Sequence, residues 1–198
     1  MNRRKQKRPA VLSLTQKIQG LNPEFARALA KLKIISPEDL RDADLDFIIA
    51  QIAGLEYNAA LRWQQQAFLQ TLFAGMTARS AGVLVNSGIV SITAMAQVDG
   101  AQLKKSLPES RLQAWKFIAS NIPANLVPEQ LETAREVEPL APPQAVALCA
   151  QGIKTLHDLR SINPSSLNFN LLPVTGKRAV ALWQYFAGLR SDYGIGPA

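Results

Sequence analysis

The residues whose chemistry is easiest to define in this sequence are a group of cations near its start. Residues 1–23 contain six basic side chains and no acidic one, a charge of +6, whereas residues 24–198 hold 16 basic and 15 acidic side chains, or +1. Five of the cations lie within the first eight residues: Arg3, Arg4, Lys5, Lys7 and Arg8. Such a cluster attracts phosphates, and binding to nucleic acid grows with local positive charge. The pattern predicts a basic arm on a nearly neutral body. Such an arm suits binding to nucleic acid or to an anionic surface, and equally a role as a solubilising tail or as a docking peptide that orders on a protein partner.

Groups that could carry out catalysis are scarce. The chain has one cysteine, Cys149, and one histidine, His157. A single cysteine excludes an internal disulfide, and one cysteine with one histidine cannot supply the four ligands of a Cys/His zinc site. Cys149 follows Leu148 on the apolar side of an expected helix, so we interpret it as a small buried hydrophobe. We interpret His157, in the first turn of another helix, as a surface residue rather than a catalytic base.

The alternating acids Asp42, Asp44 and Asp46 resemble the start of a calcium loop, but the glycine and the distal glutamate of that loop are missing. We interpret them as acids at a helix N-terminus. No phosphate-binding loop, dinucleotide fingerprint or paired-carboxylate pattern is evident. We therefore predict a protein that is not an enzyme, with no cofactor, no metal and no small-molecule substrate.

No secretory signal is apparent, because the segment after the arm is interrupted by polar residues. The longest uncharged run, Ser80 to Val98, contains Asn86, Ser87 and other polar residues, which is too polar for a lipid-facing helix. We expect a cytoplasmic protein without membrane insertion.

An internal repeat organises the rest of the chain. Starting from Leu21, Met76 and Leu140, the sequences agree at several positions without a gap, and thirteen residues after each start stands an isoleucine. The isoleucines are Ile34, Ile89 and Ile153. Each unit then has one of the three tryptophans, with alanine four residues later: Trp63–Ala67, Trp115–Ala119 and Trp183–Ala187. One helical turn separates each pair, so the alanine leaves room for a helix to pack beside the indole, and we predict that the tryptophans are core residues rather than base-stacking ones.

The units contain the start and stop signals of short helices. Gly88 and Gly152 precede their isoleucines, where a helix end favours a left-handed residue, although Lys33 holds that place in the first unit. Ser36-Pro37 and Thr155 have the features of helix N-caps. The expected organisation is a basic arm (1–20), three units (21–69, 70–121 and 140–190), a Pro/Glu-rich connector (122–139) and a flexible tail (191–198).

The pattern of the third unit resembles a known family. Leu148-x3-Gly152-Ile153-x-Thr155-x2-Asp158-Leu159, followed by Ala179-x3-Trp183-x3-Ala187, is similar to a tandem helix-hairpin-helix unit. Such units occur in DNA-repair proteins, in a bacterial transcription elongation factor and in a bacterial domain family of unknown function. The resemblance covers residues 21–189. It implies an all-α fold of three helix-hairpin-helix-like units behind the basic arm.

In nucleic-acid-binding members of that superfamily, backbone N–H groups of a hairpin at a helix N-terminus hold phosphate oxygens. The best match to such a hairpin is Leu172-Pro173-Val174-Thr175-Gly176-Lys177-Arg178, one residue short of the family pattern. The resemblance assigns close backbone approach to Gly176 and phosphate contact to Lys177 and Arg178. The first unit has Gly54 followed by Glu56, and the second has no glycine in Ser106-Leu107-Pro108-Glu109-Ser110-Arg111, so only the third hairpin has the expected chemistry.

Two functions fit these features about equally well. The first is non-sequence-specific nucleic-acid binding, DNA rather than RNA, by the third hairpin and the arm. The second is a protein-interaction scaffold or adaptor subunit of a larger assembly, with the arm as a docking segment. Residues 21–69 have 5 basic and 7 acidic side chains, or −2, which disfavours one continuous phosphate-binding groove along all units.

Overall fold

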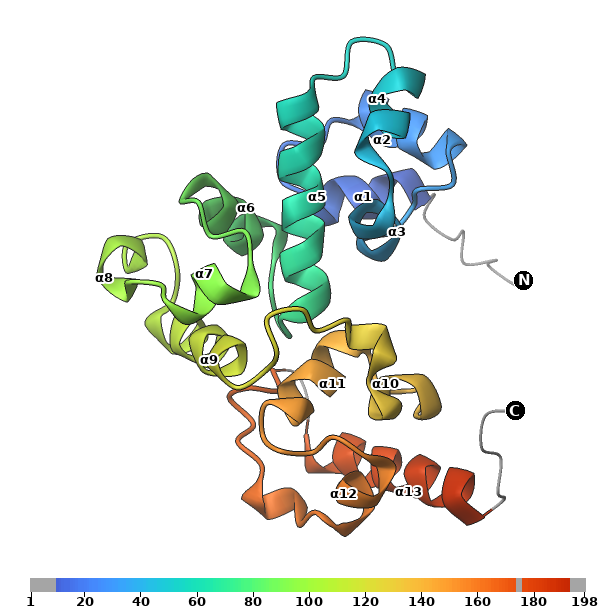
Figure 1. Ribbon diagram of the computed structural model, residues 1–198, viewed down its shortest axis with the longest axis vertical. Coiled ribbons are helices and arrows are strands. Elements are labelled where there is room, and N and C mark those ends of the chain that lie inside the picture. The colour runs from blue at the N-terminus through green and yellow to red at the C-terminus, as the bar shows by residue number, and fades with distance from the viewer. Residues whose placement is uncertain (1–9, 174–175, 193–198) are drawn as a thin grey trace, which may run out of the picture. The chain divides into compact units, whose positions relative to one another are not determined.

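The computed structural model describes residues 10–173 and 176–192, and every regular element in that part is helical, as the sequence predicts (Figure 1). Five of the site residues proposed above, Arg3, Arg4, Lys5, Lys7 and Arg8, lie outside the described residues. The described chain forms two compact bodies. The N-terminal body comprises residues up to 70 together with 77–90, and the C-terminal body comprises 71–76 and the residues from 91 onward.

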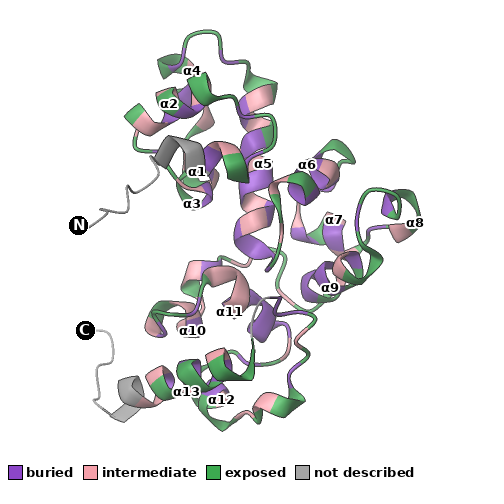
Figure 2. Ribbon diagram, turned by 180° about the vertical axis from the view of Figure 1, so that it is seen from behind, coloured by how far each residue is buried: buried purple, intermediate pink, exposed green. Residues whose placement is uncertain are grey.

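The N-terminal body contains six helices. They are α1 (Ala10–Lys17), α2 (Pro23–Lys31), α3 (Pro37–Asp42), α4 (Leu45–Gln51), α5 (Tyr57–Leu72) and α6 (Ala78–Asn86). Apolar residues of α1 to α4 form one core with Ala60, Trp63 and Ala67 of α5, whose buried positions recur along its length (Figure 2). Leu14 and Ile18 are fully buried in this core, so folded structure begins inside the segment that the charge count assigns to the arm. Trp63 on α5 packs against Phe25, with ring centroids 5.6 Å apart.

The C-terminal body holds the remaining elements. They are α7 (Ile92–Ala96), α8 (Gly100–Leu103), α9 (Glu109–Ser120), the 3-10 turn η1 (Pro128–Gln130), α10 (Glu132–Glu136), α11 (Pro142–Cys149), α12 (Leu156–Ser161), the 3-10 turn η2 (Pro164–Ser166) and α13 (Lys177–Asp192). The Pro/Glu-rich connector is part of this core, since Pro128, Thr133 and Val137 are buried. The Trp115 indole donates to the Ala74 carbonyl at 3.2 Å.

One turn recurs after α2, α6 and α11, because the same backbone geometry ends each helix. A residue with positive φ is followed by an isoleucine whose N–H bonds to the carbonyl five residues earlier. The residues and φ values are Lys33 (65°), Gly88 (80°) and Gly152 (86°). The bonds are Ile34 to Leu29 (3.0 Å), Ile89 to Leu84 (2.9 Å) and Ile153 to Leu148 (3.1 Å). Lys33 adopts the glycine conformation, which explains how the first unit keeps the turn without a glycine.

The next helix begins at the same place each time. Ser36, Ser91 and Thr155 accept a hydrogen bond from the backbone N–H three residues later, each at 3.1 Å. The carboxylates of Asp39 and Asp158 complete capping boxes in the first and third cases. These bonds satisfy N–H groups that lack partners inside the helix.

A third recurring contact joins the residue after each tryptophan to a carbonyl at or just after the end of the short helix that follows the repeat isoleucine, which is α3, α7 or α12. The side chains of Gln64, Lys116 and Gln184 donate to the carbonyls of Ala43 (2.8 Å), Val98 (2.9 Å) and Ile162 (2.7 Å). All three acceptors stand nine residues after the repeat isoleucine. Carbonyl groups at a helix end have no intrahelical donor, so the long helix supplies one from its own side chain.

Candidate nucleic-acid interface

The third hairpin is anchored by its apolar half. Leu171, Leu172 and Pro173 are buried, and the first two bond through their N–H groups to the carbonyls of Asn168 and Phe169, each at 3.1 Å. Val174 and Thr175 lie outside the described residues. Gly176 is exposed, and a Cβ at its position would meet no atom within 4 Å. A ligand therefore has open space above this backbone.

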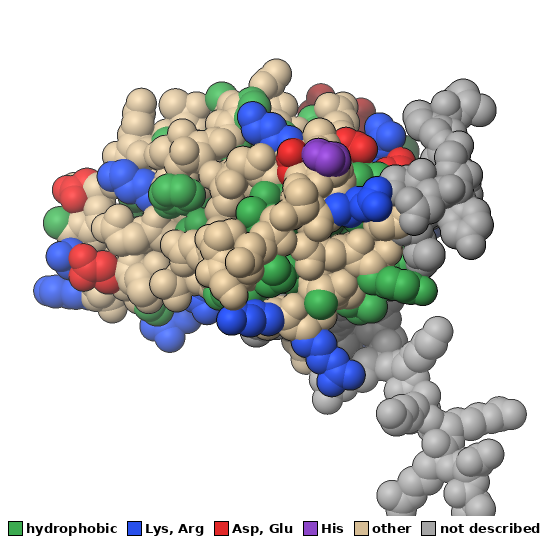
Figure 3. Space-filling model, turned by 90° about the horizontal axis from the view of Figure 1, so that it is seen from below, with side chains coloured by type: hydrophobic (Ala, Val, Ile, Leu, Met, Phe, Trp, Pro, Cys, Tyr) green, Lys and Arg blue, Asp and Glu red, His purple; other side chains and the backbone are tan. Residues whose placement is uncertain are grey.

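The two cations of the hairpin lie at the start of α13. Lys177 and Arg178 are both exposed, and among the side chains of residues 14–173 and 176–188 no ion pair involves either of them. The Lys177 ammonium donates to the Ser165 hydroxyl at 3.2 Å. The free N–H groups and the dipole of a helix N-terminus favour an anion at the same place. Figure 3 looks onto the face that includes α12 and α13, where Lys and Arg side chains are spread among polar and hydrophobic ones.

Sequence reasoning missed one cation that the fold brings to this hairpin. The Arg111 guanidinium donates a long hydrogen bond to the Asn170 carbonyl, with Nη1 and O 3.4 Å apart. The sequence disfavours phosphate binding by the second-unit hairpin, which lacks glycine and contains Glu109. Arg111 and Asn170 are 59 residues apart, and no local pattern connects them.

The same place includes a turn that sequence reasoning also missed. Gly75 has a φ of +73°, and a Cβ built on it would lie 2.5 Å from Pro173 Cγ and 3.8 Å from Arg111 Nη1. The turn at residues 73–76, the start of α9 and the third hairpin therefore meet at one point of the C-terminal body.

Gly75 has counterparts at the starts of the other units. Gly20 has a φ of +82°, and it precedes Leu21 as Gly75 precedes Met76. Each turn closes with an N–H to carbonyl bond three residues back: Leu21 to Ile18 (3.4 Å), Met76 to Phe73 (3.1 Å) and Leu140 to Val137 (2.8 Å). Pro139 takes the place of the glycine before Leu140, and the pattern apolar-x-Gly-apolar marks the Gly20 and Gly75 turns. The Gly54 turn predicted for the first unit shares it, with a φ of +77° and a bond of 3.2 Å from Leu55 to Ile52.

The Gly20 turn is tied to α5 and borders a hollow. Gln66, which is 5 % exposed, accepts from the Gln19 N–H (2.8 Å) and donates to the Gln19 carbonyl (3.1 Å). The hollow has a volume of about 370 Å³ and is lined by Gly20, Trp63, Arg62 and neighbouring residues. Arg62 is the one charged side chain among the residues that line it.

Several sequence interpretations are confirmed. The three tryptophans are buried, at 6, 1 and 2 % exposure for Trp63, Trp115 and Trp183. Cys149 is buried, and burial raises the pKa of its thiol. His157 is exposed. Asp44 is the N-cap of α4, where it accepts from the N–H groups of Asp46 and Phe47, and Asp46 lies in the first turn. The helix N-terminal interpretation is wrong for Asp42, which is the last residue of α3.

Comparison with known proteins identifies the class to which part of the chain belongs. Residues 12–67 match the model of the SAM-like helix-hairpin-helix tandem family. The match runs from α1 into α5, and it includes the turns at Gly20, Lys33 and Gly54. The protein therefore has a tandem helix-hairpin-helix region, as the resemblance of its sequence implies, and domains of this class commonly bind nucleic acid. No curated protein and no solved structure matches the chain. None of the described helices is both long and apolar enough to cross a membrane.

Proposed function

We propose that this protein binds nucleic acid without catalysing a reaction, mainly by sequence-independent phosphate contacts, and DNA in preference to RNA. The observation that carries the proposal is the pair of exposed cations in the first turn of α13, Lys177 and Arg178, beside the open backbone of Gly176. Arg111 adds a third positive charge on the same hairpin. The arm residues Arg3, Arg4, Lys5, Lys7 and Arg8 would raise the local concentration of the polyanion.

We also propose that the chain holds three helix-hairpin-helix units rather than the one region that the family model matches. The support is the recurrence of three contacts at equivalent positions: the turn before the isoleucine, the N-cap after it and the side-chain bond from the residue after the tryptophan. Only the third unit combines this framework with a hairpin that has glycine and two cations. The first and second units would stabilise the fold around the third unit without contacting phosphate themselves.

The test compares two charge reversals of equal size. Binding to a fluorescent 20-base-pair duplex is measured by anisotropy at about 50 and 200 mM salt. Lys177→Glu/Arg178→Glu should weaken binding at least tenfold and reduce the salt slope by about two, since each phosphate contact contributes about 0.9. Lys104→Glu/Lys105→Glu changes the net charge equally at exposed residues outside the hairpin and should cost much less.

A chain lacking residues 1–9 separates the contribution of the arm. If that deletion abolishes binding while the hairpin variant binds normally, the arm alone holds the nucleic acid and the role of the hairpin is wrong. Absence of salt-dependent binding by the full chain contradicts the proposal altogether.

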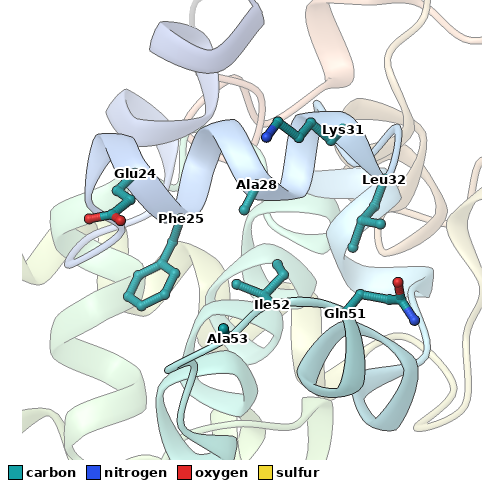
Figure 4. A pocket seen from close by; sticks show the side chains of 8 residues that line it. All are labelled: Glu24, Phe25, Ala28, Lys31, Leu32, Gln51, Ile52 and Ala53. Carbon is teal, nitrogen blue, oxygen red and sulfur yellow. The ribbon is translucent and has the colours of Figure 1, made fainter.

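A protein-interaction scaffold is the second candidate, and a groove in the N-terminal body favours it. Phe25, Ala28 and Leu32 face Ile52 and Ala53 across a hollow of about 260 Å³ between α2 and the end of α4 (Figure 4). Glu56, after the Gly54 turn, has the wrong charge for phosphate. A pull-down from native lysate distinguishes the two functions, because a scaffold retains its partners after nuclease treatment and a nucleic-acid-dependent complex loses them.

A further inference from the structure

The outward face of α13 has an aromatic side chain that the core does not use. Val180, Trp183 and Ala187 point into the core, whereas Leu182 and Tyr185 are 47 and 61 % exposed. Tyr185 is the most exposed large hydrophobic side chain among the described residues. Arg178, Leu182 and Tyr185 are spaced by four and three residues, so they form one stripe along the helix, which we call the α13 face.

Arginine side chains occur along α13 both before and after the position of Tyr185. Arg178 stands seven residues before Tyr185, about 10.5 Å along the helix axis at the usual rise. After that position, the Arg160 guanidinium of α12 lies beside Gly188, with Nε 3.9 Å from a Cβ built there. An exposed aromatic side chain on the same helix face as the exposed Arg178 matches a ligand that alternates flat apolar groups with negative charges.

The Tyr185 ring also contacts a second aromatic ring. Phe186 contacts Tyr185 almost perpendicularly, at an interplanar angle of 78° and with 5.8 Å between ring centroids. An aromatic neighbour of this kind reduces the freedom that a ring loses when another ring stacks on it.

We propose that the α13 face binds single-stranded nucleic acid, with one base stacked on Tyr185 and the neighbouring phosphates near Lys177 and Arg178. This inference rests on the proposed nucleic-acid binding and names the form of nucleic acid preferred. Bases of a duplex are already stacked on each other, and opening one step costs a few kcal/mol, so an exposed ring on a helix face selects unpaired bases. Stacking tolerates any base, which agrees with binding that does not depend on sequence.

The experiment measures anisotropy with two probes, a fluorescent 20-nucleotide oligothymidylate and the 20-base-pair duplex. Tyr185→Ala should weaken binding of the single strand by about 5-fold to 100-fold, the range of one base–aromatic stack, and change duplex binding less than twofold. Tyr185→Phe should retain single-strand binding because the ring remains. Tyr57→Ala, at a 51 % exposed tyrosine of the N-terminal body, is the matched control and should bind both probes normally.

Thermal unfolding of Tyr185→Ala checks that the exposed substitution leaves the fold intact. Equal losses for both probes, or no loss for either, overturn the role of Tyr185 while nucleic-acid binding itself stands. Binding to neither probe by the wild type overturns both proposals. If the wild type elutes as a dimer in gel filtration and Tyr185→Ala as a monomer, the α13 face holds a second copy of the chain and the inference is wrong.

Discussion

Arg111 and Asn170 are hydrogen-bonded across 59 residues of sequence, from the guanidinium at the start of α9 to the backbone carbonyl of the third hairpin. The contact ties one helix to the loop that leads into α13, where Lys177 and Arg178 are exposed. Because the donor has a charge, it adds positive potential beside the hairpin. The hairpin with the expected phosphate chemistry is thus contacted by a cation from a unit that lacks this chemistry.

Replacing Arg111 should therefore weaken nucleic-acid binding without abolishing it. Arg111→Ala removes one cation and is expected to lower the salt slope by about 0.9 and the affinity about threefold to tenfold, measured by anisotropy with the 20-base-pair duplex. Arg111→Lys keeps the charge and should keep the slope. Arg79→Ala, at an exposed arginine of the N-terminal body, is the control. An unchanged slope for Arg111→Ala would remove Arg111 from the interface.

Alanine substitutions at Gly75 and Gly54 separate two costs in unfolding free energy, that of a left-handed backbone and that of overpacking. Both glycines have positive φ, but a Cβ at Gly75 would meet Pro173 Cγ at 2.5 Å, whereas one at Gly54 would meet nothing within 4 Å. Gly54→Ala should cost about 1–2 kcal/mol of unfolding free energy for the left-handed backbone alone. Gly75→Ala should cost a further 1–3 kcal/mol, roughly, for overpacking. Urea unfolding measures both, and equal losses would show that the turn at residues 73–76 does not pack on the third hairpin.

Gln64 is expected to stabilise the end of α3 through its side-chain amide. It donates to the carbonyls of Arg41 (3.0 Å) and Ala43 (2.8 Å), groups that the helix itself leaves unpaired. Gln64→Leu should lower the free energy of unfolding by about 1–3 kcal/mol. Gln65→Leu, at the neighbouring position, makes the same chemical change where no side-chain hydrogen bond is broken and should cost less. Similar losses for the two variants in urea unfolding would argue against this role.

Asp158 gives the stability a defined pH dependence. Hydrogen bonds from the backbone of Thr155, then from that of Lys154 and from the Thr155 hydroxyl, lower the pKa of its carboxyl below the ordinary 3.8. The folded state thus favours the ionised form, so the stabilisation is complete above pH 3.8 or so and is lost as the pH falls through the lowered folded pKa.

Asp158→Ala should accordingly have a lower melting temperature than the wild type at pH 7, and the difference should shrink as the pH falls below about 3.8. Thermal unfolding followed by circular dichroism at a series of pH values measures this difference. A constant difference across that range would mean that the carboxylate charge does not stabilise the cap.

The sequence by itself determined the parts of this protein that depend on neighbouring residues. Helix ends need an N-cap such as Ser91 or a left-handed residue such as Gly152, and both act through hydrogen bonds within five positions. Burial of Trp115 was predictable for a related reason, since its spacing from Ala119 marks one face of a helix. The all-helical fold and the helix-hairpin-helix resemblance follow from such short-range patterns.

Only the tertiary structure decided which distant segments meet. Charge counting assigned the first twenty residues to the arm, yet Leu14 of α1 and Ile18 just after that helix belong to the core of the N-terminal body. The contacts of Arg111 with Asn170 and of Gly75 with Pro173 span 59 and 98 residues. Such contacts are set by the packing of whole helices, which depends on the combined shapes of many side chains and leaves no signature at any single position.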